Sequence, residues 1–129
     1  MTIRPTALAK SARGAVSYHA GRAAEISVTQ DYLCRGFGLA HERWRGKAGE
    51  IDLIMRDDDG VVFVEVKKSN SFEQAARRLT HKQMRRICCS AEEFIGNEPR
   101  GSLTDMRFDV ALVDHTGNVQ ILENAFGYD

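Results

Sequence analysis

The 129-residue chain has no excess of charge of either sign and no long apolar run. Its 18 basic and 18 acidic residues cancel at pH 7, whereas strong non-specific nucleic-acid binders are usually basic. No apolar stretch approaches the roughly 20 residues that a membrane-spanning helix needs, and the N-terminus lacks the apolar core of a signal peptide. We therefore expect a cytoplasmic protein.

Cysteine is also scarce. Cys34, Cys88 and Cys89 are odd in number and include no C-x-x-C pair, which disfavours both a disulfide framework and a zinc ribbon. Cys88 and Cys89 lie in a stretch with helical periodicity. We expect both to be buried or half-buried small apolar residues.

The length suits one domain. Residues 1–18 have weak periodicity and carry Arg4, Lys10 and Arg13 without any acid. We expect residues 1–18 to form a flexible N-terminal arm and residues 19–129 to form the domain. A basic arm can contact phosphates, but an ordinary loose terminus is the more common case.

Hydrophobic periodicity indicates an α/β fold. Two capping-box patterns, Ser71 with Gln74 and Thr80 with Gln83, mark two starts in the second helical region. The expected elements are a helix over about 20–35, strands over 39–45, 50–55 and 61–67, a helical region over 72–95 with its longer helix from about 81, and strands over 106–113 and 119–122. This order implies a mixed sheet flanked by helices, in which the first three strands form an antiparallel meander.

Three charged residues interrupt the clearest strands. In 50–55, alternation predicts Ile51, Leu53 and Met55 on one face and Asp52 with Ile54 on the other. In 61–67, Glu65 and Lys67 share a face. Ionised groups at such positions are seldom buried without partners.

A hairpin of these two strands would bring Asp52 close to Glu65. Two neighbouring carboxylates repel when both are ionised, and a divalent cation between them removes that cost. Oxygen ligands suit Mg²⁺, which can activate water for attack on a phosphodiester, and Lys67 could orient that water or offset phosphate charge. Ion pairing of the same three residues on a solvent-facing sheet is an equally good interpretation of the pattern alone.

The stretch Gly49-Glu50-Ile51-Asp52-Leu53-Ile54, followed by Phe63-Val64-Glu65-Val66-Lys67, resembles the YraN-like family of predicted endonucleases. That family is related to archaeal Holliday junction resolvases within the PD-(D/E)xK superfamily. Further matches are Gly21 with Glu25, Tyr32-Leu33, Arg107-Phe108-Asp109-Val110 and Asn124-Ala125-Phe126. The resemblance covers about residues 20–127.

The resemblance implies a restriction-endonuclease-like α-β-β-β-α-β core and a Mg²⁺ site, with Mn²⁺ as a substitute. The implied metal ligands are Asp52, Glu65, the carbonyl of Val66 and Glu25, and Lys67 takes the position of the catalytic lysine. The expected activity is hydrolysis of DNA phosphodiesters, with branched or flapped DNA and a homodimer suggested by the resolvase relationship. Lys68 and Ser69 depart from the threonine and arginine that often follow the lysine in the family.

A local basic patch follows the last site residue. Between positions 67 and 86 only Glu73 opposes the positive charges. The candidate nucleic-acid-binding residues are Lys68, Arg77, Arg78, Lys82, Arg85 and Arg86. A solvated helix face remains an alternative for the patch, and a non-catalytic nucleic-acid-binding module remains an alternative for the whole protein.

Overall fold

The computed structural model describes residues 7–127, with side chains described from residue 21 onward. Its elements are α1 (Ala7–Cys34), β1 (Gly38–Arg45), β2 (Glu50–Asp57), β3 (Gly60–Lys68), α2 (Phe72–Arg77), α3 (His81–Ile95), the 3₁₀ turn η1 (Gly101–Leu103), β4 (Met106–Val113) and β5 (Val119–Phe126). This succession confirms the predicted α/β class and the order of its helices and strands.

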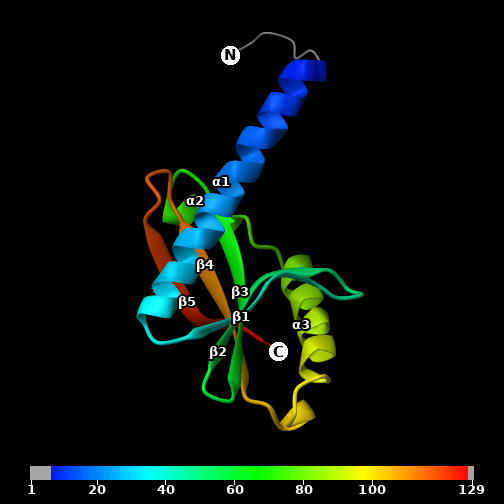
Figure 1. Ribbon diagram of the computed structural model, residues 1–129. Helices are drawn as coiled ribbons and strands as arrows, with labels where there is room; N and C mark the ends of the chain where they lie inside the picture. Colours follow the sequence, from blue (N-terminus) through cyan, green and yellow to red (C-terminus); the bar gives the residue numbers. More distant parts are fainter. Residues whose placement is uncertain (1–6, 128–129) are drawn as a thin grey trace.

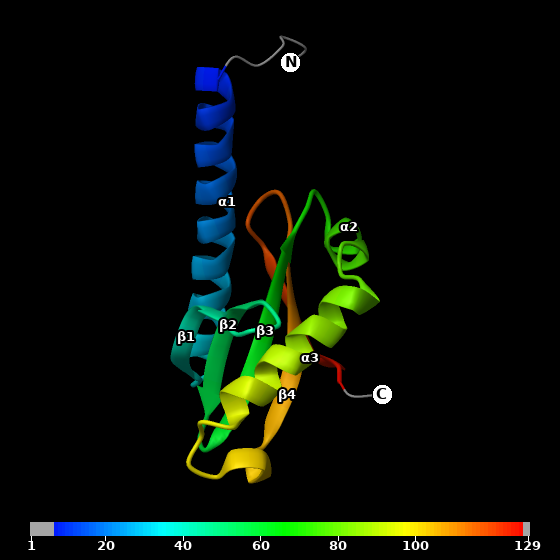
Figure 2. The same cartoon turned by 90° about the vertical axis from the view of Figure 1, so that its right-hand side faces the viewer.

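The strands form one five-stranded sheet in the order β1-β2-β3-β4-β5. All neighbours are antiparallel except β3 and β4, which run parallel because the connection through α2 and α3 returns the chain to the same end of the sheet. α1 lies on one face and α3 on the other (Figures 1 and 2). The predicted antiparallel meander of the first three strands is confirmed.

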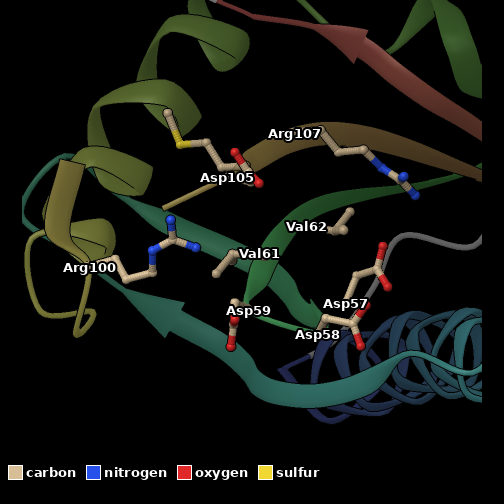
Figure 3. Close-up of a pocket in the computed structure, with 10 residues that line it drawn as sticks. Asp57, Asp58, Asp59, Val61, Val62, Arg100, Asp105 and Arg107 are labelled. Carbon is tan, nitrogen blue, oxygen red and sulfur yellow. The ribbon is translucent and has the colours of Figure 1, made fainter. Parts of the chain in front are cut away.

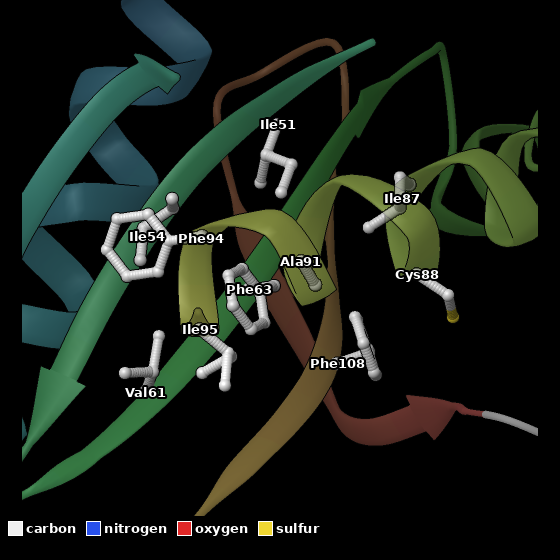
Figure 4. Close-up of a cluster of buried hydrophobic side chains, with 10 residues drawn as sticks. All are labelled: Ile51, Ile54, Val61, Phe63, Ile87, Cys88, Ala91, Phe94, Ile95 and Phe108. Atoms are coloured by element: carbon white, nitrogen blue, oxygen red, sulfur yellow. The ribbon is translucent and has the colours of Figure 1, made fainter. Parts of the chain in front are cut away.

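The core beneath α3 is built around aromatic side chains (Figure 4). Phe94 of α3 meets Phe63 and Trp44 edge to face, with ring centroids 5.8 and 5.4 Å away. An apolar stripe of α3, made of Ile87, Cys88, Ala91, Phe94 and Ile95, is buried. The Thr80–Gln83 capping box forms in full, which starts α3 where the sequence predicts.

The opposite face of the sheet is covered by α1 through Ala24, Val28 and Tyr32, spaced one turn apart. The predicted helix start near residue 20 is wrong, because α1 begins at Ala7 and its N-terminal half projects beyond the sheet (Figure 2). The alanines of that half favour a helix, but its sequence carries no apolar stripe that would predict one. Residues 1–6 of the predicted arm lie outside the described residues.

The predicted faces of β2 need one correction. Leu53 and Met55 pack beneath α1, but Ile51 packs with Ile54 beneath α3. Pairing between β2 and β3 stops at Leu53↔Val64, and strict alternation is lost where the strand leaves its neighbour.

The two neighbouring cysteines of α3 differ in exposure. Cys88 is buried, but Cys89 is exposed, contrary to prediction, because it lies on the solvent side of α3.

The last strand is longer than predicted. β5 extends to Phe126, and its pairing with β4 continues past a register shift between Phe108 and Val110. Among the described residues no helix is long and apolar enough to cross a membrane.

Candidate metal and nucleic-acid site

The site lies where β2 and β3 separate. Ladder pairing runs from Asp57↔Gly60 to Leu53↔Val64 and goes no further. One residue beyond, Oδ2 of Asp52 accepts a hydrogen bond from the Val66 amide at 2.8 Å. The carboxylate therefore takes the place of a backbone acceptor for Val66, which fixes the Asp52 side chain between the two strands.

Glu65 lies next to Asp52 and is buried, with 5% of its surface exposed. Burial, a hydrogen bond with Asp52 and the Asp52 charge together raise the pKa of Glu65 to about 9. At neutral pH the pair therefore holds a proton. The structure thus brings together the two carboxylates that the hairpin argument paired.

Lys67 shares the face of Glu65 and is mostly buried. Its Nζ lies 3.5 Å from Oε2 of Glu65, and its charge opposes the rise in the pKa of that carboxyl. A nearly buried ammonium next to a carboxyl pair offers a fixed positive charge to any anion that enters. Sequence alternation predicted this arrangement, because residues two apart in a strand face the same side.

Glu25 of α1 is placed nearby but is differently engaged. Both of its carboxylate oxygens accept from Nε of Arg43, at 3.2 and 3.1 Å. Nη1 of Arg22 lies 3.6 Å from its Oε2. Glu25 lines the same cavity of about 420 Å³ as Asp52 and Val66, and within it is paired with guanidinium groups.

The donor set fits a hard divalent cation at the Asp52–Glu65 pair. Asp52 and Glu65 share a retained proton, and loss of that proton would leave two carboxylates that repel each other. A bound cation would relieve that repulsion. Within the described part of the chain, no group of three Asp, Glu, His or Cys side chains is arranged to hold a metal ion. Glu25 therefore does not complete the predicted ligand set in this conformation, and Val66 contacts the pair through its amide.

Two predicted nucleic-acid contacts border the site itself. Lys68 and Arg78 line the same cavity as Asp52, and Nη1 of Arg78 donates to the Lys68 carbonyl at 2.6 Å. This bond ties the end of α2 to the end of β3. Arg77, its neighbour in sequence, does not line this cavity, and its Nη2 lies 3.9 Å from Oε2 of Glu73, one turn earlier on α2.

The three remaining basic residues lie along α3 and are exposed. Lys82 is in the first turn, and Arg85 borders a separate hollow between α3 and the end of β5. Arg86 lies against Gly49, where an added Cβ would come within 2.6 Å of its Cδ. The predicted patch thus divides into a part that borders the site and a part on the outer helix.

Arg43 and Arg22 are the site residues that sequence reasoning missed. Arg22 lies three residues before Glu25 in the same helix, and this i, i+3 spacing is a sequence signal that could have identified the pair. The Arg43 pair joins β1 to α1, and only the packing of these two elements reveals it.

A second polar hollow lies at the other end of the β2–β3 hairpin (Figure 3). It has a volume of about 430 Å³ and is lined by the acidic turn Asp57–Asp59 together with Arg100, Asp105 and Arg107. None of the predicted site residues borders it, so it is separate from the carboxyl pair.

A sequence model described as the uncharacterised protein family UPF0102 matches residues 24–113. A UPF0102 protein of Roseobacter denitrificans is 56% identical over 125 residues, which cover 97% of each chain. One of Ruegeria pomeroyi is 56% identical over 120 residues, covering 93% of this chain and 98% of the relative. One of Dinoroseobacter shibae is 42% identical over 122 residues, covering 95% and 91%.

Proposed function

The chain belongs to the uncharacterised protein family UPF0102, and we propose that it is a divalent-metal-dependent nuclease that hydrolyses DNA phosphodiester bonds. One observation carries the proposal. Half-buried Asp52 and buried Glu65 form a carboxyl pair between two separating strands, with the Lys67 ammonium 3.5 Å from Glu65. The resemblance to the YraN-like predicted endonucleases supports the same activity.

The proposal gives a role to each of the three charged residues and to the Val66 amide. Asp52 and Glu65 would hold the cation, and the Val66 amide keeps Asp52 in place. Mg²⁺ supplies Lewis-acid polarisation of the phosphate and lowers the pKa of the attacking water. Lys67 stabilises the negative charge that builds on the phosphate. The Glu65 proton must leave before a cation binds, because a protonated carboxyl is a poor ligand.

The surroundings of the pair favour a phosphate-bearing polymer as the substrate. Lys68 and Arg78 border the same cavity, where they would contact the backbone on either side of the scissile phosphate. No described element resembles a base-reading helix inserted for sequence recognition, so we propose selection by DNA shape. Following the resolvase resemblance, we propose branched or flapped DNA as the preferred substrate and a homodimer as the acting form.

A second candidate function is a nucleic-acid-binding module without catalysis. It is favoured by one observation, namely that the described residues gather no three metal-ligating side chains. In that case Lys68, Arg78 and the basic residues of α3 would bind nucleic acid, and the carboxyl pair would be a remnant of a metal site.

The two functions separate in a cleavage assay. Labelled linear, flapped, single-stranded and four-way-junction DNA would be incubated with the full chain in Mg²⁺, Mn²⁺ or EDTA. The matched proteins are Glu65→Ala and Asp59→Ala, the latter an exposed acid at the far end of the same hairpin.

The nuclease proposal expects metal-dependent cleavage by the wild type and Asp59→Ala, and none by Glu65→Ala. Cleavage that persists in Glu65→Ala would not depend on the carboxyl pair and would contradict the proposal. Binding without cleavage on every substrate would instead support the non-catalytic module.

A further inference from the structure

Arg43 occupies an unusual position next to the carboxyl pair. In the β1–β2 ladder Glu42 pairs with Leu53 and Trp44 with Ile51, which places Arg43 opposite Asp52. Its φ is 50°, in the left-handed region that a long side chain rarely adopts. Strained backbone of this kind persists only where the surroundings hold it, and it is concentrated at functional sites.

The Arg43 side chain reaches across to α1. Its Nε donates to both carboxylate oxygens of Glu25, at 3.2 and 3.1 Å. The Glu25 side chain is only 11% exposed, so its charge needs a partner within the protein. Arg22 is a weaker partner, because it lies 3.6 Å from Glu25 and equally 3.6 Å from Glu42.

We propose that Arg43 is a positioning residue that holds Glu25 in an ion pair and thereby competes with the divalent cation for this carboxylate. The inference rests on the proposed metal site. Glu25 and Asp52 line one cavity, so a cation held by Asp52 would lie in the cavity that Glu25 also borders. In the present conformation the guanidinium supplies the positive charge that the cation would otherwise supply to Glu25.

This competition has a thermodynamic consequence. A cation that recruits Glu25 must first break the Arg43 ion pair, so Arg43 lowers the affinity of the wild type. Removal of Arg43 releases Glu25 to bind, and the gain disappears when Glu25 cannot coordinate. The competition is therefore identified by an effect of the Arg43 substitution on cation affinity that depends on the presence of the Glu25 carboxylate.

The test measures Mn²⁺ binding to the full chain by electron paramagnetic resonance, in the absence of DNA. The proteins form a cycle of wild type, Arg43→Ala, Glu25→Gln and the double variant. We expect Arg43→Ala to bind Mn²⁺ about tenfold more tightly than the wild type, the size of change caused by altering groups that hold metal ligands. The double variant should bind like Glu25→Gln.

Two controls separate positioning from general charge. Arg43→Lys retains a positive charge beside Glu25 and should bring the affinity back toward the wild-type value. Arg45→Ala removes an exposed arginine from the same strand, one that pairs with Glu50, and should leave the affinity unchanged. Urea unfolding of each protein verifies that the fold is intact.

Equal affinity in Arg43→Ala and wild type overturns the inference, as does a gain that persists in the Glu25→Gln background. In both cases, Mn²⁺ binding that is lost in Glu65→Gln would leave the proposed metal site standing. A wild type that binds no Mn²⁺, or binds it equally in Glu65→Gln, would overturn the metal site and this inference together.

Discussion

The Val66 amide donates a hydrogen bond to Oδ2 of Asp52 at 2.8 Å, across the point where β2 and β3 separate. Asp52 is thus both a candidate metal ligand and the acceptor that satisfies a backbone N–H. Removal of the Asp52 side chain would relieve its repulsion with Glu65, but it would also leave the Val66 amide without this acceptor.

Asparagine and alanine should therefore differ at position 52. Asp52→Asn retains an acceptor for Val66 and removes the charge, so we expect equal or higher unfolding free energy in EDTA and loss of cation binding. Asp52→Ala leaves the amide without a partner and should lower the unfolding free energy by about 1–3 kcal/mol. Urea unfolding in EDTA measures both values. Equal destabilisation by the two variants would indicate that the Asp52 charge itself stabilises the fold.

Stability without metal should fall as the pH rises. The pKa of Glu65 is about 9 in the folded protein and close to 4.5 when unfolded, so the unfolded chain releases this proton first. The stabilising contribution is complete below pH 4.5, declines as the pH rises and is lost above pH 9. Urea midpoints from pH 5 to 9 in EDTA should decline more steeply for the wild type than for Glu65→Gln. Parallel profiles would contradict the raised pKa.

The buried network of Asp109 should be costly to break. Asp109 is fully buried and accepts hydrogen bonds from the Tyr32 hydroxyl at 2.7 Å, from the Arg107 guanidinium and from the backbone N–H of Asn124. Burial and Asp109 raise the pKa of Tyr32, so the hydroxyl stays protonated and donates.

We expect Tyr32→Phe to lower the unfolding free energy by about 1.5–3 kcal/mol, the range for hydrogen bonds to charged groups. Thr29→Val is the control, because the Thr29 hydroxyl donates to the Glu25 carbonyl of its own helix. Its smaller expected effect would be measured in the same urea series. A Tyr32→Phe protein as stable as the wild type would show that other donors satisfy Asp109.

Gly49 should not tolerate a side chain. Its φ is 148°, and a Cβ there would lie 2.6 Å from Cδ of Arg86. We expect Gly49→Ala to lower the unfolding free energy by about 1–3 kcal/mol. The double variant Gly49→Ala/Arg86→Ala would remove the contact with the Arg86 side chain but would keep the backbone strain at position 49. Gly96→Ala is the matched control, because Gly96 has a helical φ of −58° and only ordinary contacts around its Cβ.

DNA binding should depend on the basic residues that border the cavity. The measurements use a Glu65→Gln background that prevents cleavage. Lys68→Ala and Arg78→Ala should each weaken DNA binding and reduce the slope of log affinity against log salt concentration by the amount expected for about one phosphate contact. Arg56→Ala serves as control, because Arg56 pairs with Glu98 at 2.6 Å toward the other end of β2. Fluorescence anisotropy at several salt concentrations measures the slopes, and equal slopes for all three variants would contradict a phosphate contact in the cavity.

Much of the fold could be predicted because its signals are local. The β-rich composition of 61–67, the Thr80 capping box and the helical periodicity before residue 95 each depend on neighbours within a few residues, and the strand and the helix that they predict are present. The N-terminal half of α1 could not be located by the same method, because its sequence carries no periodic apolar pattern.

The sequence by itself determined that Asp52, Glu65 and Lys67 interrupt two apolar strands, which was enough to bring them together once a hairpin was assumed. The tertiary structure alone decided that pairing ends at Leu53, that Asp52 binds the Val66 amide, and that Glu25 pairs with Arg43. These contacts join residues 14 and 18 positions apart, on separate elements. Their geometry depends on where the strands separate and on how α1 packs against β1. Neither of these features produces a periodic pattern in the sequence.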